Sequence, residues 1–290
     1  MGKDNLWNNE VEVRFFKETL KSFASPEQLF YKFAEGYFAY VPKHHDAEGQ
    51  TIQSRNSLIG QFTEKWCKDL LSPIARELNL FAINGAECEE LGLTRQSSAD
   101  LAFCVKDSKI QNASDVKLIF EIKMSIVSNY SYDKKTKNIT YIGDYKSHKG
   151  NPALLRSDSM LKAIGKAINI RVSGISSTKI PILVLGNSPI TDSYTHKVDY
   201  LKKAGVVQGF ISLNPKPTES EYIEKTEAMG FQTIMEIDML QLIIAKLIKA
   251  DMNYFSSMLS KNDLGKIITI AAQEKTEIEK AEKFLSLIRG

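Results

Sequence analysis

The sequence predicts an α/β protein in which a central mixed β-sheet is flanked by α-helices, with extra helices at both ends of the chain. Three observations predict this fold class. Apolar residues recur at three- to four-residue spacing in the first part of the chain, as they do in amphipathic helices. Short apolar runs that are typical of strands follow in the middle. After residue 116 such runs alternate with helical segments, which indicates a mixed sheet flanked by helices.

The amino-terminal part of the chain is predicted to be helical. Helical spacing of apolar residues extends over residues 10–23 and 27–41, and Ser25-Pro26 marks the break between these two helices. The polar residues 42–55 that follow predict a loop.

A long helix is expected after this loop. Asn56 or Ser57 is suited to its amino-terminal cap, and the helical spacing continues to about residue 79. Pro73 predicts a kink or a division near the end of this helix, because proline cannot donate the helical hydrogen bond. The apolar stripe of the helix consists of Leu58, Phe62, Trp66 and Leu70.

The middle of the chain carries the predicted strands. Short apolar runs predict strands over residues 80–83, 100–105 and 116–124. Residues 107–114 are suited to a connection between the last two of these strands. The polar residues 129–140 predict a second hairpin.

Helices and strands alternate in the rest of the chain. Helices are expected over residues 152–171, 192–204, 219–229, 236–249 and 263–287. Strands are expected over residues 180–186, 206–213 and 231–234. No linker forces a domain boundary, so we expect one domain over residues 1–290. Its parts are a helical segment over about 1–55, a core over about 56–215 and a second helical segment over about 216–290.

Composition excludes some classes of protein. A formal net charge of +3 permits a polyanionic partner without requiring one. The cysteines Cys67, Cys88 and Cys104 form no C-x-x-C pair, so we expect neither a disulfide framework nor a zinc ribbon, and a reducing cytoplasm fits best. The first residues lack the apolar segment of a signal peptide. The most apolar run, residues 239–248, is too short to span a bilayer, so no membrane partner is expected.

The candidate chemistry lies at the end of the strand over residues 116–124. Because side chains of a strand alternate between two faces, Glu121 and Lys123 share one face, while Phe120 and Ile122 point to the core. Asp100 opens the preceding apolar run, which could pair with this strand and bring a second carboxylate close.

These residue types suit a divalent metal. The carboxylates of Asp100 and Glu121 and the backbone carbonyl of Ile122 offer hard oxygen ligands for Mg²⁺, which lowers the pKa of a bound water. Lys123 could orient that water and stabilise developing negative charge. The sequence pattern acidic-x-Lys occurs five times in the chain. Only the position of Glu121 and Lys123 at the end of an apolar run distinguishes this occurrence from the others.

The arrangement Ala99-Asp100 followed by Glu121-Ile122-Lys123 resembles the PD-(D/E)xK nuclease superfamily, notably the type II restriction endonucleases. The resemblance covers about residues 56–186, and Ala99 stands where the motif has proline. It implies a hairpin that carries the motif with a helix on either side. It also implies a Mg²⁺ cofactor, with Asp100 and Glu121 as metal ligands and Lys123 as the catalytic lysine.

The same resemblance implies a further acidic residue and a mode of assembly. The helix before the hairpin often contributes another carboxylate near the metals, and Glu64 is suitably placed in the expected helix. Restriction enzymes of this kind usually act as homodimers on palindromic double-stranded DNA, so a twofold dimer is implied.

Basic residues after the motif favour a nucleic-acid partner. Along the helix expected over residues 152–171, Arg156, Ser159, Lys162 and Lys166 fall on one face, and Leu154, Leu161, Ile164 and Ile168 line another. Such a basic stripe could follow a phosphate backbone. The polar hairpin with Lys134 and Lys135 could reach a groove of the DNA.

Two alternatives stay open at this point. The chain could be a repair, recombination or junction-resolving nuclease of the same superfamily, acting on branched or damaged DNA. It could also be a non-catalytic DNA-binding or assembly protein in which the acidic-x-Lys pattern is accidental. The sequence does not reveal the bases recognised, because base readout depends on a few side chains presented in a groove.

Overall fold

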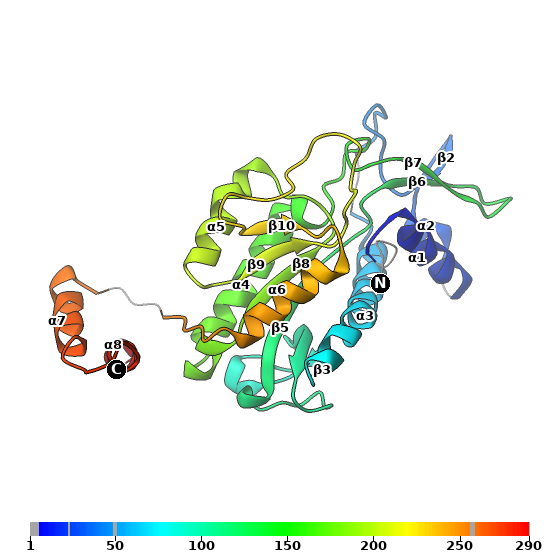
Figure 1. Cartoon of the computed structure of the whole chain (residues 1–290). Coiled ribbons are helices and arrows are strands. Elements are labelled where there is room, and N and C mark those ends of the chain that lie inside the picture. The colour runs from blue at the N-terminus through cyan, green and yellow to red at the C-terminus, as the bar shows by residue number, and fades with distance from the viewer. Residues whose placement is uncertain (1–5, 23, 49–50, 256–258, 290) are drawn as a thin grey trace.

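The protein folds around a six-stranded sheet, seen in a computed structural model (Figure 1) that describes residues 6–22, 24–48, 51–255 and 259–289. Residues 1–4, where no signal peptide is expected, and Phe23 lie outside the described residues. The strands are β3 (Phe81–Ala86), β4 (Ala99–Cys104), β5 (Val116–Lys123), β8 (Ile182–Gly186), β9 (Gly209–Ser212) and β10 (Phe231–Thr233).

The sheet is mixed. Its strand order is β10-β9-β8-β5-β4-β3, in which β3, β4 and β5 pair antiparallel and β5, β8, β9 and β10 pair parallel. Strand β5 is therefore the boundary between the antiparallel and the parallel half. The predicted α/β class with a mixed sheet flanked by helices is confirmed.

Helices cover both faces of this sheet. One face packs against α1, α3 and α6, and the other against α4 and α5. Strand β5 alternates as predicted, with Phe120 in the first core and Ile119 in the second. The helices are α1 (Asn9–Ser22), α3 (Gln53–Glu77), α4 (Ser157–Val172), α5 (Thr195–Lys203) and α6 (Ile237–Lys249). Helix α3 continues through Pro73 to Glu77, so the proline does not end it.

A second, four-stranded sheet lies beside the first. Its order is β1-β2-β6-β7, formed by β1 (Tyr31–Phe33), β2 (Gly36–Phe38), β6 (Asn129–Tyr132) and β7 (Ile139–Gly143). The predicted hairpin over residues 129–140 is confirmed by β6 and β7. The predicted helix over residues 27–41 is wrong, because only α2 (Pro26–Leu29) is helical there. Aromatic residues favour strands, and Gly36, at a φ of 137°, allows the tight turn between β1 and β2.

The predicted helix over residues 219–229 is also wrong. The segment is irregular and is tied to α5 through one carboxylate. Asp199 accepts hydrogen bonds from the backbone N–H groups of Ala228 and Gly230 and from the hydroxyl of Thr226. These tertiary hydrogen bonds replace the helical ones, and the helical spacing of the segment does not decide its structure.

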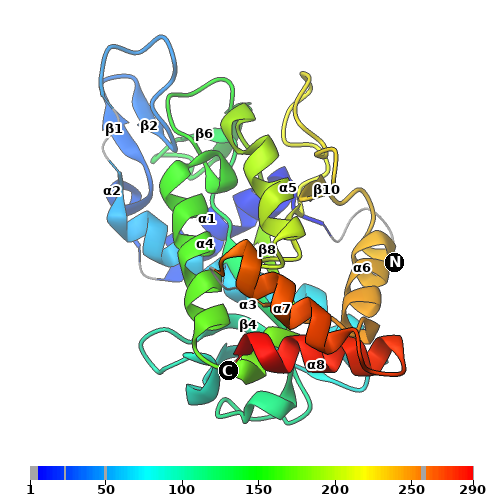
Figure 2. The same cartoon turned by 90° about the vertical axis from the view of Figure 1, so that its left-hand side faces the viewer.

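The single helix expected over residues 263–287 is two helices, α7 (Lys261–Ala271) and α8 (Glu277–Arg289). A capping box separates them, because the N–H of Glu279 donates to the hydroxyl of Thr276 and the N–H of Thr276 donates to the carboxylate of Glu279. The two helices pack on each other and stand apart from the sheet (Figure 1), and Figure 2 shows them from the side that faces away from it. Among their described residues, Ala271 alone is buried.

A buried carboxyl group fixes the chain that follows β5. Glu12 on α1 accepts hydrogen bonds from Trp7, from the backbone N–H groups of Val127 and Ser128, and from the hydroxyl of Tyr130. Burial raises its pKa to about 7, although these four donors oppose the shift. The segment after β5 is therefore held against α1.

No helix in the described part of the chain is long and apolar enough to cross a membrane. Cys67, Cys88 and Cys104 are all buried and free, as expected of a chain without a disulfide framework.

Candidate active site

The antiparallel pair β4 and β5 brings Asp100 and Glu121 together. The last paired residues of the two strands are Leu101 on β4 and Phe120 on β5. Asp100 and Glu121, the next residue on each strand, therefore face each other where the pairing stops. The carboxylate of Asp100 takes the place of the missing backbone partner, because its Oδ2 accepts the N–H of Ile122 at 2.7 Å. The two carboxylates are thereby fixed on adjacent strands.

Lys123 completes the cluster that the sequence predicts. Its ammonium group forms an ion pair with Oε1 of Glu121, lies 3.6 Å from Oδ2 of Asp100 and donates to the carbonyl of Ile122 at 3.2 Å. The side chain of Glu121 is 6% exposed, while those of Asp100 and Lys123 are 19% and 20% exposed. The cluster is thus shielded from bulk water but can still be reached from solvent.

A second lysine enters the cluster from α4. The Nζ of Lys166 lies 2.9 Å from Oδ1 of Asp100 and 2.7 Å from Oε2 of Glu121. The sequence predicts Lys166 on the DNA-facing stripe with Lys162, but the structure places the two amines in different surroundings. The side chain of Lys166 is 17% exposed and that of Lys162 is 74% exposed.

Helical spacing could have distinguished these two lysines. Helix α4 buries Met160, Ala163, Ala167 and Ile170, and Lys166 stands at the edge of this small-residue stripe. The apolar face expected from the sequence is only partly buried, since Leu161 and Ile168 are 62% and 45% exposed. The small alanines let α4 approach the sheet, so a lysine beside them reaches the strand ends.

Glu64 lies within electrostatic reach of the cluster. It is half-buried on α3, and the side-chain amide of Asn84 on β3 donates to its backbone carbonyl at 3.1 Å. Burial and the nearby charge of Asp100 raise the pKa of its carboxyl. Glu64 lies on the helix before the hairpin, as expected, and its part in the site stays a prediction.

The environment pushes the pKa values of the two central carboxyls apart. Burial disfavours the charge of Asp100, but Lys123, Lys166 and the N–H of Ile122 outweigh burial, so its pKa lies below the usual value. For Glu121, burial and then the charge of Asp100 dominate, so its pKa is raised. Burial disfavours the ammonium of Lys166, but the two carboxylates outweigh it and raise its pKa. Pairs of carboxyls with divergent pKa values are typical of catalytic sites.

The donor set fits Mg²⁺. Oε2 of Glu121 is buried and accepts no hydrogen bond from the described residues, although the ammonium of Lys166 lies close to it. A cation, the ammonium of Lys166, thus already lies between Oδ1 of Asp100 and Oε2 of Glu121. In the described part of the chain no three His, Cys, Asp or Glu side chains gather as a metal-binding group. Mg²⁺ commonly takes one or two protein carboxylates and completes its shell with waters and substrate phosphates.

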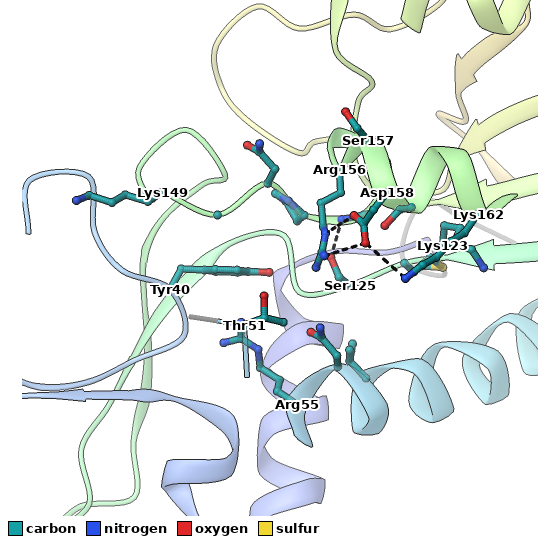
Figure 3. Close-up of a pocket in the computed structure, with 18 of the residues that line it drawn as sticks. Tyr40, Thr51, Arg55, Lys123, Ser125, Lys149, Arg156, Ser157, Asp158 and Lys162 are labelled. Atoms are coloured by element: carbon teal, nitrogen blue, oxygen red, sulfur yellow. Dashed lines mark hydrogen bonds and ion pairs between the residues drawn. The ribbon is translucent and has the colours of Figure 1, made fainter. Parts of the chain in front are cut away.

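An open groove of about 890 Å³ begins at the cluster, with Ile122 and Lys123 in its wall (Figure 3). It runs between the amino-terminal ends of α3 and α4. Asp158 sits between Arg156, 2.9 Å away, and Lys162, 3.6 Å away. The basic residues that line the groove are Arg55, Lys123, Lys149, Arg156 and Lys162.

One wall of this groove is not predicted from the sequence. The buried guanidinium of Arg55 lies over the ring of Tyr40, 4.6 Å from its centroid, and donates to the carbonyls of Leu29 and Ala39. His148, which does not itself line the groove, stacks on the Tyr40 ring, with centroids 4.0 Å apart. These residues come from three separate segments, so no local spacing pattern could have revealed them.

Lys134 and Lys135 lie elsewhere. They are exposed in the turn between β6 and β7 and do not line the groove, and the Nζ of Lys134 lies 3.9 Å from Glu27. A role for this turn in DNA contact stays a prediction.

Comparison with known proteins adds no family. No protein-family model, curated protein or solved structure matches this chain. Its function is therefore inferred from the residues of the cluster and of the groove.

Proposed function

We propose that this protein is a Mg²⁺-dependent DNA endonuclease, most simply a type II restriction enzyme that hydrolyses phosphodiester bonds at a specific double-stranded site. One observation carries the proposal: Asp100, Glu121 and Lys123 meet at the end of one antiparallel strand pair, beside an open basic groove. The resemblance to the PD-(D/E)xK arrangement gives these three residues their roles.

Asp100 and Glu121 would hold the metal, with the carbonyl of Ile122 as a further oxygen ligand. When bound, Mg²⁺ supplies a water of lowered pKa and neutralises charge on the scissile phosphate. Lys123 is restrained by Asp100 and Glu121, so its ammonium is positioned to orient the attacking water and to stabilise negative charge on the phosphate. Glu64, with its raised pKa, is the candidate for an additional proton acceptor or metal contact near the cluster.

The groove supports a polyanionic substrate. Lys149, Arg156 and Lys162 line it together with Lys123, so phosphates along the groove would meet cations before they reach the cluster. Asp158 holds Arg156 and Lys162 in place. The turn with Lys134 and Lys135 extends from the smaller sheet and is our candidate for contact with DNA outside the groove.

Cleavage at palindromic sites calls for a homodimer, because a twofold protein matches a twofold site. Helix α4 supports this part of the proposal, since Leu161, Ile168 and Val172 on its outer side are 62%, 45% and 69% exposed. Exposed apolar residues that cluster on one helix face are typical of a protein–protein contact.

The test is digestion of a long, defined double-stranded DNA with Mg²⁺ or with EDTA, followed by sequencing of the ends. Discrete fragments with one shared end sequence support a restriction enzyme. Cleavage confined to branched or damaged DNA would reject the restriction enzyme and support a repair or junction-resolving nuclease. The absence of Mg²⁺-dependent cleavage on all these substrates would leave a DNA-binding protein without catalytic activity.

A further inference from the structure

Lys166 is the one member of the cluster to which the proposed hydrolysis gives no role. It comes from α4, far along the chain from the hairpin, and yet its ammonium contacts an oxygen of each carboxylate. These are Oδ1 of Asp100 and Oε2 of Glu121, whereas Lys123 contacts the other oxygen of each. The two lysines therefore divide the four carboxylate oxygens between them.

Lys166 and the backbone contact different oxygens of Asp100. Oδ2 of Asp100 accepts the N–H of Ile122, whereas Oδ1 of Asp100 accepts a hydrogen bond from Lys166 at 2.9 Å and Oε2 of Glu121 lies 2.7 Å from the same ammonium. A point between Oδ1 of Asp100 and Oε2 of Glu121 is where a cation shared by the two carboxylates would sit. The ammonium of Lys166 stands at that point.

Burial makes this contact energetically important. Two carboxylates on adjacent strands repel each other, and a single lysine leaves the pair with excess negative charge. Lys166 supplies the second positive charge and balances Asp100 and Glu121 together with Lys123. Its flexible four-carbon stem allows the amine to move away without any movement of the backbone of α4.

We propose that Lys166 is a built-in counter-ion that occupies the position of the divalent cation between Asp100 and Glu121 and must be displaced when the metal binds. The proposal rests on the metal site of the proposed function. The amine stabilises the metal-free protein and at the same time weakens its affinity for the metal, because the two cations compete for the same oxygens.

The matched variants are Lys166→Met and Lys162→Met. Both replace a lysine of α4 by an uncharged side chain of similar length, but Lys162 contacts Asp158 and not the cluster. Calorimetric titration of MgCl₂ into metal-free protein should show K166M binding at least about tenfold more tightly than the wild type. K162M should bind Mg²⁺ as the wild type does.

Thermal unfolding gives a second readout that needs no catalysis. In EDTA, K166M should unfold at a lower temperature than the wild type and K162M, and added MgCl₂ should raise its unfolding temperature by more. If K166M does not fold in EDTA, Lys166→Arg decides the question. An arginine keeps the charge, so K166R should bind Mg²⁺ no more tightly than the wild type, and tighter binding would overturn the proposal.

Equal or weaker Mg²⁺ binding by K166M would also overturn the counter-ion role, even in a protein that cleaves DNA. If K166M binds Mg²⁺ more tightly but the wild-type protein cleaves no DNA, the counter-ion role of Lys166 is supported and the nuclease activity is rejected. If neither protein binds Mg²⁺, both proposals fail.

Discussion

The backbone N–H of Ile122 donates to Oδ2 of Asp100 at the point where the pairing of β4 with β5 stops. The carboxylate of Asp100 is thus both a candidate metal ligand and the partner of a backbone group. Substitutions can separate these two roles. Asp100→Asn keeps an oxygen for Ile122 but removes the charge, whereas Asp100→Ala leaves a partly buried N–H without its acceptor.

Both variants should lose Mg²⁺-dependent cleavage, and D100A should be less stable than D100N by about 1 kcal/mol. Urea unfolding in EDTA measures the difference in stability, and plasmid digestion measures activity. Equal stability of the two variants would show that the hydrogen bond to Ile122 contributes nothing to the fold. Cleavage by D100N at the wild-type rate would remove Asp100 from the metal site.

Lys123→Ala should lower cleavage at least about a hundredfold while DNA binding survives, because the lysine acts on the reacting phosphate and water. Lys117→Ala is its control. Lys117 belongs to another acidic-x-Lys copy on the same strand, but it is exposed and donates to the carbonyl of Ser114. Single-turnover cleavage and a binding titration are measured for both variants. A K123A enzyme as fast as K117A would reject the assignment.

The central part of the fold and three residues of the cluster could be predicted from the sequence. Period-two alternation in β5 placed Phe120 and Ile122 in the core and Glu121 and Lys123 on the opposite face, because the pattern of a strand is local. The apolar run that begins at Asp100 indicated only that it could pair with β5, and the two strands do pair. Both inferences depend on the alternation of side chains along a strand, which can be recognised from neighbouring residues in the sequence.

The remainder depends on tertiary contacts that no local pattern encodes. Lys166 stands at the edge of the small-residue stripe of α4, but its contact with the carboxylates depends on how closely α4 approaches the sheet, which helical spacing does not determine. The apolar residues of the aromatic-rich β1–β2 hairpin recur at three- to four-residue spacing, which is also typical of a helix. The segment forms strands because β2 pairs with β6. The stack of Arg55, Tyr40 and His148 joins distant segments.

His148 should make the protein sensitive to acid. Burial lowers the pKa of its imidazole to about 4, against an ordinary value near 6.5. The neutral ring is required in the fold, because Nδ1 accepts the N–H of Gly150 and Nε2 then donates to the carbonyl of Val127. Below pH 6.5 the unfolded chain binds a proton that the folded protein does not. The contribution of His148 to stability is therefore complete above pH 6.5 and is lost as the pH falls toward 4.

The measurement is urea unfolding at pH 7.5 and pH 5.5. His148 should account for about 1 kcal/mol of the loss of stability between these pH values. His148→Asn should be less stable at pH 7.5 but should lose about that much less on acidification. His44→Asn, at an exposed position, should follow the wild type at both pH values. The same acid sensitivity in H148N as in the wild type would contradict this assignment.

The outer side of α4 should form the contact between two copies of the chain. Leu161→Glu combined with Val172→Glu places two charges on this exposed apolar side and should convert a dimer to a monomer. Ile110→Glu is the control, because Ile110 is 76% exposed in the connection before β5. Light scattering after size exclusion gives the mass of each protein. A wild type that is monomeric at every concentration, or a double variant that stays dimeric, would reject this surface.

The groove beside the cluster should bind the phosphate backbone of DNA. Lys162→Ala and Arg156→Ala each remove one cation from its lining, so each should weaken binding to all sequences about equally. Each should also reduce the slope of log K against log salt by about one, because one phosphate is no longer neutralised.

Lys203→Ala, on the exposed side of α5, should leave the slope unchanged. Fluorescence anisotropy with a labelled duplex in EDTA, between low and moderate salt, provides the slopes. If K162A and R156A keep the slope of the wild type and of K203A, the phosphates do not follow this groove, and the DNA path must be sought elsewhere, beginning with the β6–β7 turn.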